Sequence, residues 1–190
     1  MNDNGVILHE QFNALKRYSF NFDRNVIFKN GLYVLFEKGE KFLEFDRIVR
    51  VGTHTGQNNL VKRLTEHFLK PNKDRSIFRK HIGRAILSRD NNLELLKQWE
   101  IDLTGKKARE EWAGKIDTAA IKSVEDRVTA YMQEYFTFSV IPLETKEERL
   151  FFEAGIIATT SRSPHFYPSA NWLGKFSPEE KIRTRGVWLV

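Results

Sequence analysis

Two short apolar segments that lie close together along the chain constrain its fold more than any other feature. Residues 31–37 (GLYVLFE) and 45–52 (FDRIVRVG) are rich in β-branched and aromatic residues, a composition typical of β-strands. The segment between them, 37–44, contains Gly39 and five charged residues, which suits the loop of a hairpin. The sequence therefore predicts two neighbouring antiparallel strands.

A helix is expected directly after this hairpin. The Gly/Asn-rich turn 55–59 leads into residues 60–68 (LVKRLTEHF), and Asn58 or Asn59 is a suitable N-cap. Leu60, Leu64 and Phe68 form its apolar stripe. Arg63 and His67 are four residues apart, so they share one face of the helix beside that stripe.

The rest of the chain adds one strand and several helices. Helical spacing of apolar residues predicts helices over 8–17, 75–87 and 121–135, and period-two alternation predicts a strand over 135–143 (YFTFSVIPL). The sequence Thr145-Lys146-Glu147-Glu148 is a capping box that opens another helix. The polar segment 89–118 is interpreted as an insertion with short helical pieces. The predicted fold class is α/β of the α+β type, a single domain over 1–190 with a three-stranded antiparallel sheet flanked by helices.

The positive charge is concentrated in one window. Residues 61–90 contain nine Lys/Arg and three Asp/Glu, so this window carries the whole net charge of +6. Phosphate contacts with Lys and Arg release counterions, which indicates a surface for nucleic acid. A solvated basic helix face without a partner is the alternative. The residues predicted to bind DNA, with the helix 75–87 turning its basic residues outward, are Lys62, Arg75, Arg79, Lys80 and Arg84.

The order of the short motifs resembles that of the GIY-YIG nuclease family. Gly31-Leu32-Tyr33 opens the first strand, Arg50-Val51-Gly52 closes the second, the next helix carries Arg63 and His67, and a later capped helix carries Glu153. The resemblance covers about residues 29–175. It implies a GIY-YIG-like nuclease core over 29–175 with the insertion at about 89–118, and terminal extensions at 1–28 and 176–190.

The resemblance also implies catalytic roles. Tyr33 would activate a water molecule, Arg63 would stabilise the phosphate and His67 would orient Tyr33. Glu153 would hold Mg²⁺ or Mn²⁺, and Asn171 would help to position a phosphate or a water. For Tyr33, the alternative is an ordinary half-buried strand tyrosine.

The surroundings of Glu153 support a metal-binding role. Its helical neighbours Leu150, Ile156 and Ile157 are apolar, and only Arg149, four residues earlier, is polar. A carboxylate among apolar side chains costs several kcal/mol unless it is paired or binds a metal. A hard divalent ion held by one carboxylate, water and substrate phosphate meets that need. The alternative is a surface pair of Glu153 with Arg149.

One residue departs from the family pattern. Arg50 occupies the position where the second tripeptide usually begins with tyrosine. By strand alternation Arg50 should point away from Val49 and Val51, to the same face as Tyr33. There it would favour the phenolate or bind phosphate; a degenerate site is the other interpretation. Restriction-type members tolerate a basic residue here, and His54 is a further candidate near the site.

The sequence thus predicts a metal-dependent endonuclease that hydrolyses DNA, possibly of the sequence-specific restriction type. A catalytically degenerate nucleic-acid-binding module and a non-enzymatic interaction protein are the alternatives. A sequence-specific enzyme is expected to act as a homodimer, because one site cuts one strand at a time. The chain has no cysteine and no apolar stretch of membrane-spanning length, so disulfides and a membrane partner are not expected. A cytoplasmic location is expected.

Overall fold

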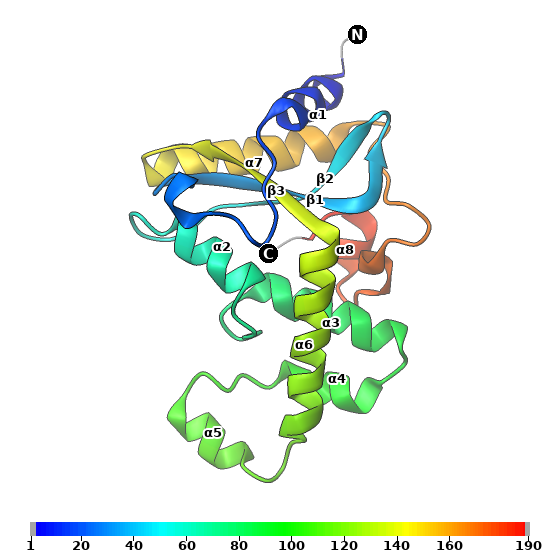
Figure 1. The fold of residues 1–190 in the computed structure, drawn as a ribbon. Coiled ribbons are helices and arrows are strands. Elements are labelled where there is room, and N and C mark those ends of the chain that lie inside the picture. Colours follow the sequence, from blue (N-terminus) through cyan, green and yellow to red (C-terminus); the bar gives the residue numbers. More distant parts are fainter. Residues whose placement is uncertain (1–2, 189–190) are drawn as a thin grey trace.

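A computed structural model describes residues 3–188. Its centre is a three-stranded antiparallel sheet in the order β2-β1-β3, formed by β1 (Gly31–Phe42), β2 (Phe45–Gly52) and β3 (Phe136–Pro142). Helices surround the sheet on both faces (Figure 1). The predicted α+β fold with a small antiparallel sheet is confirmed.

Each face of the sheet has its own hydrophobic core because side chains alternate along β1. Tyr33 and Leu35 point into the larger core, which includes residues of α2 (Leu60–Phe68), α3 (Ile77–Arg89) and α6 (Thr118–Tyr135). Leu32, Val34 and Phe36 point to the opposite face, where they pack with Ile156 of α7 (Lys146–Arg162) and with Phe12 of α1 (Asn4–Ala14). In Figure 1, α1 and α7 lie above the sheet, and α2 and α3 lie below it.

The hairpin is longer than the sequence indicated. The prediction of a loop over 37–44 is wrong, since β1 continues to Phe42 and the turn consists of Leu43 and Glu44. Two of the five charged residues that suggested a loop, Glu37 and Glu40, are buried. Glu37 accepts hydrogen bonds from the indoles of Trp172 and Trp188 at 2.8 and 3.0 Å.

The helix predicted over 8–17 is α1, which begins and ends earlier, whereas α3 and α7 begin at residues with capping side chains. Ser76 caps α3 by accepting from the Arg79 amide, and the capping box of Thr145 and Glu148 at the start of α7 is present. Asn59 is the N-cap residue of α2, one of the two candidates predicted, but it makes no side-chain capping hydrogen bond, since its Nδ2 donates to the Thr55 carbonyl instead.

The insertion contains two short helices, as expected. These are α4 (Leu93–Glu100) and α5 (Lys106–Trp112), which extend away from the sheet beside the lower half of α6 (Figure 1). Trp99 of α4 is fully buried, and its indole ring lies directly over Gly83 of α3, where any Cβ would overlap it. This contact holds α4 against α3.

The C-terminal segment packs back on the larger core. It contains the short 3₁₀ helix η2 (Leu173–Phe176) and α8 (Glu180–Arg185); a further 3₁₀ helix, η1 (Arg24–Val26), precedes β1. Ile182 and Trp188 are buried, and the Trp188 amide donates to the Val49 carbonyl at 2.7 Å. Trp188 thereby lies beside β2, next to the motif Arg50-Val51-Gly52.

Candidate active site

Tyr33 and Gly52, the last residues of the two tripeptides, are direct partners across β1 and β2. Tyr33 is fully buried on the face of the sheet that α2 covers. Its hydroxyl lies over the Cα of Gly52 and 2.7 Å from Nε2 of His67 in α2. The two motifs and the helix that follows them therefore meet at one hydroxyl group.

His67 is held from both sides. Its Nδ1 lies 2.7 Å from the hydroxyl of Ser76, the cap of α3, and its ring is fully buried. Burial lowers the pKa of His67 well below its ordinary value, and the nearby charges of Arg50, Arg63 and Arg79 lower it further. The imidazole is therefore neutral at physiological pH.

Arg50 lies on the same face as Tyr33, as the strand alternation predicted. Its partner across β1 is Leu35, and its guanidinium lies 4.9 Å from the centre of the Phe78 ring. The prediction that Val49 points the opposite way is wrong, because the register shifts between Leu35 and Phe36 and both Val49 and Arg50 face the larger core. A bulge of this kind redirects one side chain.

The Arg50 side chain bonds to Trp188 of the C-terminal segment. Nη1 donates to the Trp188 carbonyl at 2.7 Å, while Nε is buried without a hydrogen-bond partner among the described residues. A buried guanidinium N–H without an acceptor is costly and is a candidate for bonding to water or to an anion.

Arg63 is partly exposed and lies at the edge of the candidate site. It donates to the Arg75 carbonyl at 3.3 Å and lies 3.8 Å from Glu66 on its own helix. Both contacts are weak by their length, so the guanidinium keeps donors for a further acceptor.

Glu153 reaches the site from the opposite face of the sheet, around the edge strand β2. Burial raises its pKa, and the charges of Arg50 and Arg63 oppose that shift. Arg149 does not pair with it: this guanidinium donates to the carbonyls of Glu144 and Gly56 at 2.9 and 3.2 Å. The alternative of an Arg149–Glu153 surface pair is therefore wrong.

These residues surround a cleft of about 330 Å³ at the edge of the sheet. Its lining includes Arg50, Gly52, His54, Arg63, Arg149 and Glu153. The Tyr33 hydroxyl lies one layer behind, against Gly52. His54 also lines a smaller neighbouring hollow, and its buried Nδ1 has no hydrogen-bond partner among the described residues. Burial lowers the pKa of His54, with Arg149 acting in the same direction.

The donor set fits a metal held by few protein ligands. Glu153 is the carboxylate of the cleft lining, and no group of three or more His, Cys, Asp or Glu that could hold a metal occurs within residues 3–188. Mg²⁺ commonly binds through one or two carboxylates and completes its octahedron with water and substrate phosphate. A half-buried carboxylate facing two arginines is compatible with that mode.

The predicted DNA-binding residues do not form one surface. Lys62 and Arg75 are exposed, and Lys62 lines the smaller hollow beside the cleft. The prediction that Arg79 points outward is wrong. Arg79 is fully buried and paired with Glu125 of α6 at 2.7 Å, and it also donates to the His67 carbonyl at 3.0 Å.

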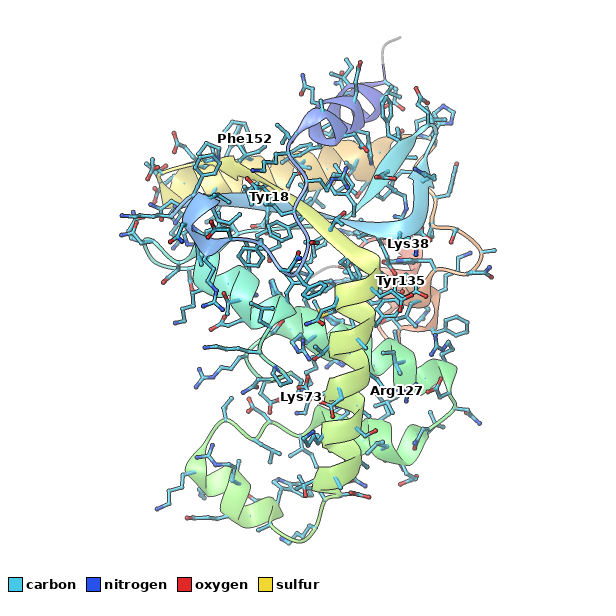
Figure 2. The ribbon with its side chains drawn as sticks, viewed as in Figure 1. Tyr18, Lys38, Lys73, Arg127, Tyr135 and Phe152 are labelled. Atoms are coloured by element: carbon cyan, nitrogen blue, oxygen red, sulfur yellow. The ribbon has the colours of Figure 1, made fainter. Side chains whose placement is uncertain are left out.

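Other Lys and Arg side chains of the window 61–90 form hydrogen bonds and ion pairs with the segment 89–118 and with the C-terminal segment. Lys80 donates to the Glu100 carbonyl, and Arg84 pairs with Glu100 and Glu179. Lys73 lies beside α6 (Figure 2), and its ammonium group pairs with Asp74 at 2.6 Å and donates to the Ile101 carbonyl. Much of the charge that suggested a single basic patch thus neutralises nearby carboxylates.

Asn171 lies apart from this constellation. It is exposed, it precedes the buried Trp172, and it is not part of the cleft lining. The structure thus brings together Arg50, Arg63 and Glu153 around the cleft and places Tyr33 and His67 behind it.

The sequence model of the GIY-YIG domain family matches residues 8–190 of this chain. The chain belongs to the GIY-YIG family. This membership indicates a nuclease and agrees with the resemblance inferred from the two tripeptides. Comparison with curated proteins and with solved structures found no match. Within the described part of the chain, no helix is both long and apolar enough to cross a membrane.

Two residues of the candidate site were not predicted from the sequence. Ser76 contacts His67, and Arg149 lines the cleft beside Glu153. A signal for Ser76 existed, since a serine directly before an apolar helical pattern is an N-cap candidate. Nothing in the local sequence shows that its hydroxyl also reaches a histidine nine residues earlier.

Proposed function

We propose that this GIY-YIG protein is a divalent-metal-dependent endonuclease that hydrolyses DNA phosphodiester bonds. The observation that carries the proposal is the cleft in which Glu153 faces Arg50 and Arg63 next to the Tyr33–His67 pair. Two cations and one carboxylate beside a potential proton acceptor match the needs of phosphodiester hydrolysis.

Each residue has a distinct role in the proposed reaction. Arg63 and Arg50 bind the non-bridging oxygens of the scissile phosphate and stabilise the charge that develops on them. Tyr33 acts as the tyrosinate after its own proton has passed to solvent. It accepts a proton of the attacking water while the water oxygen bonds to phosphorus and the bond to the leaving oxygen breaks, and the leaving oxygen takes a proton from solvent. His67 positions the Tyr33 hydroxyl through their 2.7 Å contact.

Glu153 is the residue that would hold Mg²⁺ or Mn²⁺. Such an ion would polarise the phosphate and stabilise the leaving oxygen. The geometry supports this role, because Glu153 is half-buried and lines the same cleft as both arginines.

The proposed DNA contacts around the cleft are limited to exposed cations. Lys62 and Arg75 lie next to Arg63, whereas Arg79, Lys80 and Arg84 bond mainly to other protein groups. Recognition of a specific sequence, as in a restriction-type enzyme acting as a homodimer, would fall to the insertion with α4 and α5.

A catalytically degenerate nucleic-acid-binding module is the second candidate. Two observations favour it: Arg50 replaces the usual tyrosine and is bonded to the Trp188 carbonyl, and Tyr33 is fully buried. Such a module would bind DNA without a metal and leave it intact.

The test is a plasmid-nicking assay with Mg²⁺, with Mn²⁺ and with a chelator. The wild type should cut only with a metal, and Glu153→Gln should lose cleavage while it still folds and binds DNA. Glu147→Gln is the matched control, since Glu147 is an exposed carboxylate on the same helix. Tyr33→Phe should reduce cleavage by ~10²-fold or more, the usual scale for loss of a general base. Full activity of Glu153→Gln would refute the assigned metal site, and intact plasmid under all conditions would favour the binding module.

A further inference from the structure

Ser76 connects the cap of α3 to the imidazole behind the cleft. Its hydroxyl accepts the Arg79 amide at 3.3 Å and lies 2.7 Å from His67 Nδ1, and its side chain is fully buried. On the other side of the ring, His67 Nε2 lies 2.7 Å from the Tyr33 hydroxyl. A neutral imidazole thus sits between two hydroxyl groups.

The hydrogen-bond inventory limits how this chain of three groups is protonated. A neutral imidazole has one donor nitrogen and one acceptor nitrogen, so one flanking hydroxyl donates to it and the other accepts from it. The hydroxyl that accepts must direct its own hydrogen elsewhere. The assignment therefore depends on which of the two hydroxyl oxygens is free to accept a hydrogen bond from the ring.

The surroundings of the two hydroxyls differ in this respect. Among residues 3–188 the Ser76 hydroxyl has two partners, the Arg79 amide, which is a donor, and His67 Nδ1. Its hydrogen therefore has one available acceptor, Nδ1. The Tyr33 oxygen, in contrast, has His67 Nε2 as its one partner among residues 3–188. It accepts from no other group there, whereas the Ser76 oxygen already accepts the Arg79 amide, so Tyr33 is the hydroxyl that is free to accept from the ring.

We infer that Ser76 is a positioning residue that fixes His67 as the tautomer with hydrogen on Nε2. The serine hydroxyl donates to Nδ1, and Nε2–H donates to the Tyr33 oxygen. The catalytic consequence rests on the proposed nuclease function. His67 is then a hydrogen-bond donor that stabilises the tyrosinate form of Tyr33, and the tyrosinate accepts the proton of water.

The charges around the ring agree with this assignment. Arg50 of β2, Arg63 of α2 and Arg79 of α3 all lower the pKa of His67, in addition to the effect of burial. A second proton on this ring is therefore strongly disfavoured. His67 is poorly suited to remove a proton from Tyr33, and donation from Nε2–H needs no change in its charge.

The first measurement is the protonation of the His67 ring nitrogens by NMR, on histidine-labelled ¹⁵N protein without DNA or metal. The chain has five histidines, and His67→Asn identifies the relevant signals by their loss. The wild type should show hydrogen on Nε2 and none on Nδ1. Hydrogen on Nδ1, or on both nitrogens at neutral pH, would overturn the inference. Because no cleavage is involved, this result is independent of whether the protein is a nuclease.

The second measurement separates the tautomer from helix capping. Ser76→Gly removes the hydroxyl but keeps a residue that is acceptable at an N-cap. Ser76→Thr keeps both functions. We expect mixed tautomers and about tenfold slower single-turnover cleavage in Ser76→Gly, less than the ~10²-fold scale of losing the proton acceptor itself. Thermal unfolding confirms that each variant folds. A pure Nε2–H tautomer in Ser76→Gly would show that Ser76 does not set it.

Discussion

The Tyr33 hydroxyl occupies the space where Gly52, its partner across the hairpin, would carry a Cβ atom. The ring has no room to give way, because Tyr33 is fully buried and its hydroxyl is held by His67. The glycine that ends β2 is therefore required by the close approach of a side chain to the backbone. The two tripeptides of the family pattern meet in this contact.

The first prediction follows from this contact. Gly52→Ala should destabilise the fold by ~1–3 kcal/mol through overpacking and should shift the Tyr33 hydroxyl, so cleavage should fall more than stability alone explains. Urea unfolding and single-turnover cleavage measure the two effects. Gly155→Ala in α7 is the control, because its Cβ would meet no atom within 4 Å. A Gly52→Ala variant with wild-type stability would contradict the packing described for Tyr33.

Short-range patterns predicted the elements that carry the site. The hairpin, the helix with Arg63 and His67, and the capped helix with Glu153 all depend on local periodicity and capping, which a sequence displays directly. Strand alternation correctly placed Arg50 on the same face as Tyr33.

Long-range pairing explains where the sequence was misleading. Glu37 resembled a loop residue because its partners Trp172 and Trp188 lie more than 130 positions later. Arg79 resembled a surface residue because Glu125, which neutralises it, lies 46 positions away. The bulge at Val49 depends on the register with β1, and no local pattern reports that register.

The second prediction concerns the buried pair of Arg79 and Glu125. Arg79→Met should lower the free energy of unfolding by about 3–5 kcal/mol, because it leaves the Glu125 carboxylate buried without its countercharge. Adding Glu125→Gln should recover part of that loss, since the uncharged amide keeps an acceptor for the Lys73 amide. Arg75→Met, at an exposed site, should change stability little. Urea denaturation of the wild type and these three variants measures the differences in the free energy of unfolding. An Arg79→Met variant as stable as the wild type would refute the prediction.

The third prediction separates exposed cations from paired ones. If the cleft binds DNA, Lys62→Ala and Arg75→Ala should each reduce the slope of log K against log salt by ~0.9 when the residue contacts a phosphate. Arg84→Ala should leave the slope unchanged, because Glu100 and Glu179 already bond its guanidinium. Fluorescence anisotropy over a range of salt concentrations measures the slopes. A smaller slope for Arg84→Ala, with unchanged slopes for Lys62→Ala and Arg75→Ala, would contradict the prediction. It would place the DNA beside Arg84, on the side of α3 that faces the segment 89–118.

The last prediction concerns His9, a buried histidine outside the site. Its Nδ1 bonds to the Gly5 carbonyl at 2.8 Å, and its Nε2 accepts the Ile48 amide at 3.2 Å, so only the neutral ring fits. Burial lowers its pKa from 6.5 to about 4. Between these values the unfolded chain binds more protons than the native protein, so stability is complete above pH 6.5 and falls as the pH decreases toward 4.

The loss from His9 alone should reach roughly 3 kcal/mol when the pH passes below its native pKa. His9→Gln keeps an amide donor and acceptor but cannot titrate, so its stability should fall less steeply between pH 6.5 and 4 than that of the wild type. Urea denaturation at several pH values measures both slopes. His67 and His81 also have lowered pKa values, so the variant should retain some acid sensitivity. Equal slopes for the two proteins would show that His9 protonates as readily in the native state as in the unfolded chain.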